Sequence, residues 1–132
     1  MLKLVLAIIA VTLIIFVVPI AVYGIFQATI GAEMPQGASP VMFLTGVFVE
    51  KFGTAIAFCT IFYLARKALT GQWLAYAAIW WIMFAFGEAS QLFISNYGWN
   101  EVVAGLISEA IYFPAAAWVV NRIWNDRSIV PE

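Results

Sequence analysis

Long apolar stretches separated by short polar segments dominate this chain. Four of them, at about 4–30, 41–65, 73–95 and 102–121, reach the roughly 20 mostly apolar residues that a helix needs to cross a bilayer. The connections between the last three are short, which favours antiparallel packing of successive helices. The pattern predicts an all-α integral membrane protein, in which residues 1–132 form a single antiparallel bundle of four transmembrane helices.

Residues at the ends of these stretches give local helix signals. Ser39 followed by Pro40 is typical of a helix start, with serine as the N-cap and proline in the first turn. Asn100 is expected to cap the last helix, with Glu101 in its first turn. The stretch 4–30 is longer than the roughly 7–15 apolar residues of a secretory signal. We therefore expect 4–30 to be a retained membrane span.

The distribution of basic residues predicts the orientation. In the four-span topology, five of the six Lys and Arg residues fall on one side of the membrane, and the loops of the other side contain Glu33 and Glu101 without a basic residue. Because cytoplasmic loops are enriched in Lys and Arg, both termini are predicted to be cytoplasmic in a multi-pass protein of the plasma (inner) membrane. The five basic residues are Lys3, Arg66, Lys67, Arg122 and Arg127.

Composition excludes several functional classes. Charged residues make up 10% of the chain, against roughly a quarter in soluble domains, and the net charge is −1. This charge cannot form the basic surface of a nucleic-acid-binding protein. The chain has no histidine and a single cysteine, Cys59, which excludes His-based metal sites, Ser-His catalysis and an internal disulfide. We therefore expect no metal and no cofactor.

Four charged residues, Glu50, Lys51, Glu88 and Glu109, interrupt the apolar stretches. Each costs about 2.5–3.5 kcal/mol at the centre of a bilayer. At a rise of about 1.5 Å per residue, Lys51, Glu88 and Glu109 all lie about 20–22 Å from the cytoplasmic ends of their helices. The sequence thus predicts one polar layer in the outer half of the membrane. Helical spacing adds Gln91 beside Glu88 and Tyr112 beside Glu109.

Two interpretations of this layer remain open. In the first, it is a pocket open to the outside that binds a substrate, and some of its carboxylates hold protons because of desolvation and mutual repulsion. Its predicted substrate-binding residues are Glu50, Lys51, Glu88, Gln91, Glu109 and Tyr112. In the second, Lys51 pairs with Glu88 or Glu109 and fastens the bundle, while Glu50 reaches the headgroups.

Three functions follow from these interpretations. The first is a small transporter or a solute- or ion-binding protein, expected to be oligomeric in a lipid membrane. The second is an accessory or assembly subunit whose membrane partner pairs with the charges. The third is an enzyme acting on a lipid with Glu88 and Glu109 as acid and base. For the oligomer, Glu50 shares a helical stripe with Gly46, Gly53 and Ala57, which suits either a second subunit or a tight crossing within the chain.

Overall fold

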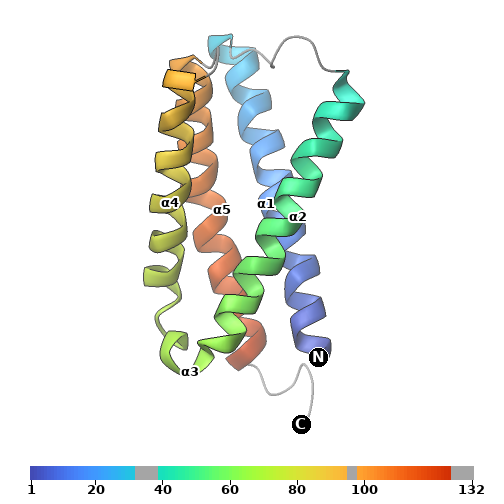
Figure 1. Cartoon of the computed structure of the whole chain (residues 1–132), viewed down its shortest axis with the longest axis vertical. Helices are drawn as coiled ribbons and strands as arrows, with labels where there is room; N and C mark the ends of the chain where they lie inside the picture. The colour runs from blue at the N-terminus through green and yellow to red at the C-terminus, as the bar shows by residue number, and fades with distance from the viewer. Residues whose placement is uncertain (32–38, 95–97, 126–132) are drawn as a thin grey trace.

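The computed structural model describes residues 1–31, 39–94 and 98–125, and this part of the chain is almost entirely helical, with no strand. Four long helices and one short one follow each other along the chain (Figure 1). The predicted all-helical class is confirmed. The helices are α1 (Leu2–Ile30), α2 (Pro40–Leu64), α3 (Arg66–Leu69), α4 (Trp73–Ile94) and α5 (Trp99–Asn125).

The start of α2 agrees with the sequence signal, and the start of α5 does not. Ser39 is the N-cap of α2, where its side chain accepts a hydrogen bond from the backbone N–H of Met42 at 3.2 Å. The expectation that Asn100 caps the last helix is wrong. Asn100 lies inside α5, because the carbonyl of Gly98 already accepts the first helical bond, from the N–H of Val102 at 3.2 Å.

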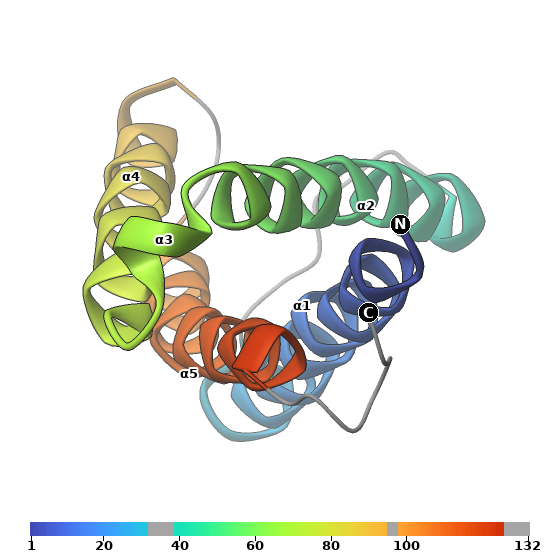
Figure 2. The ribbon, with the colours of Figure 1, turned by 90° about the horizontal axis from the view of Figure 1, so that it is seen from below.

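The four long helices pack in the order α2, α1, α5 and α4. Helix α5 packs along both α1 and α4, and α2 packs against α1 (Figure 2). The short α3 and the turn at Gly71, with φ of +83°, connect α2 to α4. Figure 1 shows that α2 crosses the bundle at a slant, so its Pro40 end stands away from α4 while its Leu64 end lies close to it.

Aromatic side chains fill the core where α2, α4 and α5 converge. Phe58 is fully buried, and its ring centroid lies 4.6 Å from that of Tyr76 and 5.3 Å from that of Trp80. Phe113 of α5 stacks on the same ring at 6.0 Å. The hydroxyl of Tyr76 donates a hydrogen bond to the carbonyl of Phe58. This cluster joins α2 to α4 at one end of the bundle and leaves their other ends free to diverge.

Among the described helices, three are long and apolar enough to cross a membrane, which is compatible with a multi-pass membrane protein. These are α1 over Leu2–Thr29, α2 and α5. The 22-residue α4 is not one of them, so the predicted fourth span stays a prediction. Glu33 and Arg127, which entered the orientation argument, lie outside the described residues.

Candidate functional site

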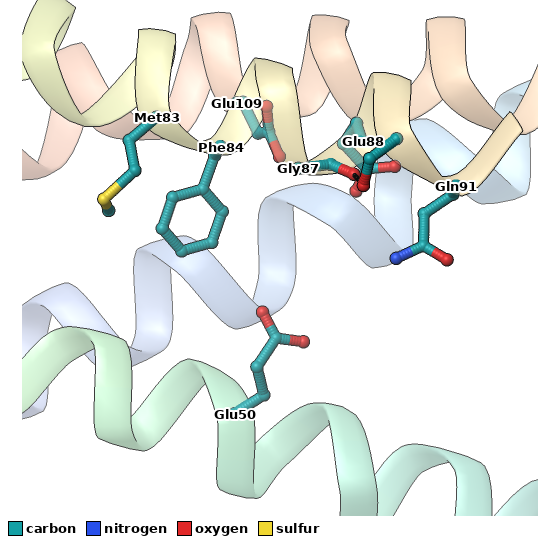
Figure 3. Close-up of a pocket in the computed structure, with 8 residues that line it drawn as sticks. Glu50, Met83, Phe84, Gly87, Glu88, Gln91 and Glu109 are labelled. Carbon is teal, nitrogen blue, oxygen red and sulfur yellow. Dashed lines mark hydrogen bonds between the residues drawn. The ribbon is translucent and has the colours of Figure 1, made fainter. Parts of the chain in front are cut away.

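A cavity of about 380 Å³ lies where α2 diverges from α4, with α5 behind it. Its lining combines carboxyl, amide and hydroxyl groups with the apolar side chains of Met83 and Phe84. Figure 3 shows Glu50 of α2 pointing into the cavity from the side opposite Glu88 and Glu109. The lining residues are Glu50, Met83, Phe84, Gly87, Glu88, Ser90, Gln91 and Glu109.

Glu88 is half-buried and Glu109 is buried, and each has one buried carboxyl oxygen without a hydrogen-bond partner among the described residues. Glu109 is only 2% exposed, although it lines the cavity. Within the described part of the chain, Oε2 of Glu109 and Oε2 of Glu88 have no hydrogen-bond partner. A buried carboxylate without a partner is costly in a low-dielectric environment. Each group thus retains the capacity to bind a proton or a cation.

Gly105 of α5 allows the carboxyl group of Glu88 to approach the helix backbone. A Cβ atom at Gly105 would lie 2.6 Å from Cδ of Glu88 and 2.8 Å from its Oε2. Such distances are shorter than real side-chain contacts, so a side chain at this position would have to displace the carboxyl group. The absence of a side chain at Gly105 therefore helps to determine where Glu88 lies.

Lys51 points into the bundle, while its neighbour Glu50 lies at the edge. The Lys51 side chain is 11% exposed and that of Glu50 is 56% exposed. Nζ of Lys51 donates to Oε1 of Glu50 at 3.1 Å. The same Nζ lies 5.5 Å from the ring centroid of Phe84 and 5.6 Å from that of Tyr112. The ion pair found for Lys51 is thus with Glu50, and not with Glu88 or Glu109 as the fastening interpretation expected.

The structure brings the six predicted site residues to one region. Glu50, Glu88, Gln91 and Glu109 line the cavity. Lys51 and Tyr112 lie beside it and contact each other, and Tyr112 is 1% exposed with a hydroxyl group that has no hydrogen-bond partner among the described residues. Their role in binding a substrate stays a prediction.

Sequence reasoning missed the apolar part of the site and its glycine. Met83 and Phe84 line the cavity, and Gly105 contacts Glu88. A signal existed for Phe84, which precedes Glu88 by four residues and so lies on the same helix face. No such signal identified Gly105, because its importance depends on how α4 packs against α5.

The small-residue stripe of α2 faces outward. Gly46, Gly53 and Ala57 are exposed, and no atom lies within 4 Å of a Cβ added at either glycine. A tight crossing within the chain at these glycines is therefore not observed. Packing of the stripe against a second subunit stays a prediction.

Charge and lining indicate which ligands suit the cavity. Three carboxyl groups and one ammonium group gather in or beside it, so acidic groups are in excess. Across the described ranges, no three acidic, cysteine or histidine side chains are grouped so that they could hold a metal ion. The arrangement can accept protons or bind a cation that also has apolar surface.

Comparison of the chain with protein-family models, with curated proteins and with solved structures finds no match.

Proposed function

We propose that this chain is a small membrane transport or solute- or ion-binding protein whose binding site is the cavity between α2, α4 and α5. The observation that carries the proposal is Glu109, whose carboxyl group is almost fully buried, lines the cavity and leaves Oε2 unpartnered within the described residues. Ionisable residues inside membrane segments usually serve a substrate or ion pathway.

The ion pairing within the chain supports this function over a fastening role. A buried pair that stabilises a bundle needs good geometry between opposite charges. Lys51 is the cation nearest the cavity, and it donates to the partly exposed Glu50. Glu88 and Glu109 are therefore left to share protons or an external cation.

We also propose the topology in which this site works. At about 1.5 Å per residue, the 22 residues of α4 extend over about 33 Å, which matches a hydrocarbon thickness of about 30 Å. All four long helices then cross the membrane, both termini are cytoplasmic, and the cavity lies in the outer half. In a Cys59→Ala background, Gly98→Cys should react with an impermeant maleimide in intact cells, whereas Thr70→Cys should react only after permeabilisation. The reverse pattern would contradict this orientation.

Proton-coupled transport provides the functional test. The full chain is reconstituted in liposomes that contain a pH-sensitive dye, and internal pH is followed after a pH gradient is imposed and a panel of small cations is added. We expect protein-dependent proton movement that is lost in Glu88→Gln and in Glu109→Gln, because the amide removes the exchangeable proton and keeps the shape. Glu101→Gln is the matched control, since Glu101 lies on α5 and does not line the cavity.

The comparison between the three variants decides the result. Equal proton movement in wild type, Glu88→Gln and Glu109→Gln would refute a transport role for these carboxyl groups. Equal loss in all three variants, including Glu101→Gln, would point to general damage of the fold and would also count against the proposed site.

A second candidate function, an accessory subunit of a membrane complex, is favoured by the outer face of α2. Glu50 is 56% exposed on a helix apolar enough to cross a membrane, and the glycines of its stripe are exposed as well. An exposed charge and small residues on one helix suit close packing with another membrane helix. Purification in mild detergent tests this: a stoichiometric partner protein should be recovered, and Gly53→Leu should release it. Recovery of the chain alone, as a monomer or as a homo-oligomer, would exclude this candidate.

A further inference from the structure

The surroundings of the Lys51 ammonium group form a cation-binding site that the chain occupies with its own side chain. Nζ of Lys51 lies over the faces of Phe84 and Tyr112 at 5.5 and 5.6 Å and donates to the Glu50 carboxylate at 3.1 Å. Ammonium groups are attracted to aromatic faces, and more strongly where water is excluded. The chain therefore shows, with its own lysine, which type of group is accommodated beside this cavity.

The acidic side of the cavity still has unused binding capacity. Lys51 engages Glu50, whereas Glu88 and Glu109 each present a buried oxygen with no hydrogen-bond partner among the described residues. Glu109 is the stronger observation, because its side chain is almost completely buried and still lines an open space. A cation placed in this space would meet the carboxyl groups of Glu88 and Glu109 next to the apolar side chains of Phe84 and Met83, with Glu50 on the opposite side of the cavity.

The lining selects between kinds of cation. Inorganic cations such as Mg²⁺ or Ca²⁺ bind to shells of six or more oxygen ligands. The ring of Phe84 and the thioether of Met83 offer no such ligands, but they pack well against an alkyl chain. A volume of about 380 Å³ falls in the range of pockets that bind small organic molecules.

We propose that the cavity binds a primary ammonium compound with a short apolar chain, and that the Lys51 ammonium is a tethered competitor that weakens this binding. The proposal rests on the proposed function and names its substrate class. The ammonium group of the ligand lies against Glu88 and Glu109, and its apolar chain packs on Phe84 and Met83. Lys51 opposes it through like charge and by occupying the shared face of Phe84.

Two sources supply such a group. A free amine enters from water. The headgroup of an aminolipid enters from the side, because the cavity lies where α2 and α4 diverge (Figure 1). Both present the same ammonium chemistry, and the composition of the bilayer separates them.

The experiment is calorimetric titration of butylammonium into the full chain in phosphatidylglycerol nanodiscs at constant ionic strength. We expect saturable binding, about tenfold tighter in Lys51→Met and at least tenfold weaker in Glu109→Gln, where a tenfold change corresponds to about 1.4 kcal/mol. Lys67→Met is the matched control: it removes the same charge on α3, away from the cavity, and should bind as wild type does. In nanodiscs that contain phosphatidylethanolamine, a lower apparent affinity identifies the lipid headgroup as a competitor, and an unchanged affinity identifies the free amine as the ligand.

The wild-type chain provides a second measurement that does not depend on how a variant folds. Butylammonium should bind at least fivefold more tightly than methylammonium, because only the longer chain reaches the apolar lining. Absence of saturable binding in both wild type and Lys51→Met would overturn the proposal, and so would equal affinities for the two amines together with no gain in Lys51→Met. Glu88- and Glu109-dependent proton movement without amine binding would remove this inference and leave the proposed function. Amine binding without proton movement would leave this inference and remove transport.

Discussion

Replacement of Gly105 by alanine tests the contact between α4 and α5 that places the Glu88 carboxyl group. The added Cβ would lie 2.6 Å from Cδ of Glu88, so the flexible end of that side chain must move. Alanine in place of glycine inside a helix stabilises it by about 1 kcal/mol. Holding a side chain away from its preferred rotamer costs about 0.5–1.5 kcal/mol. The two effects nearly cancel, and we expect almost no net change in the free energy of unfolding.

Gly53→Ala is the matched control for this prediction, because an added Cβ there has no atom within 4 Å. It should gain the full helix contribution, about 1 kcal/mol, so the two variants should differ by about 1 kcal/mol. In a Glu88→Ala background the clash is absent, and Gly105→Ala should then stabilise the protein as much as Gly53→Ala does.

The double-mutant cycle of Gly105→Ala and Glu88→Ala isolates the contact between these two residues as a coupling free energy of about 1 kcal/mol. Unfolding in mixed micelles, followed by far-UV circular dichroism, measures all variants. Equal gains from Gly105→Ala with and without Glu88 would refute this placement of the carboxyl group.

Three further predictions concern the fold, and the same unfolding assay checks the first and third. Phe58→Ala should destabilise by about 3–5 kcal/mol because the ring is fully buried, whereas Phe93→Ala, with a ring that is 88% exposed, should change stability by less than about 0.5 kcal/mol; equal losses would contradict the core. Ser39→Ala should lower hydrogen-exchange protection in the first turn of α2 by about 0.5–2 kcal/mol, while Ser39→Asp retains it; unchanged protection in the alanine variant would argue against the cap. Gly71→Ala should cost about 1–2 kcal/mol because φ is +83°, with a smaller loss for Gly71→Asn; no loss would exclude the left-handed turn.

The helices were predictable because their causes are local. A run of apolar residues long enough to span a bilayer predicts a helix whatever surrounds it, and Ser39 with Pro40 marked the start of α2 correctly. The position of the charged residues along their helix axes could also be predicted from the sequence, because the rise per residue of a helix is fixed. Glu50, Glu88 and Glu109 do line one cavity.

Contacts between helices were not predictable from the sequence. Whether Lys51 reaches Glu50, Glu88 or Glu109 depends on the slant of α2, and no local pattern fixes that slant. The role of Gly105 depends on the packing of α4 against α5, which brings the Glu88 carboxyl group against it. Asn100 was assigned as a cap on residue type, but the carbonyl of Gly98 makes the first helical bond. In each of these cases the interaction depends on the packing of another helix or on a backbone hydrogen bond, and neither can be read from the local sequence.

The packing of α5 against both α1 and α4 has a consequence for biosynthesis. A ribosome releases helices in chain order, so α4 is synthesised before its main neighbour α5 exists. Until α5 has been synthesised, the Glu88 carboxyl group cannot pack against Gly105. The indole N–H of Trp81 also lacks its acceptor, the carbonyl of Leu106, to which it donates at 3.2 Å. In the proposed four-span topology, the polar half of α4 would therefore complete these contacts only after α5 has joined it.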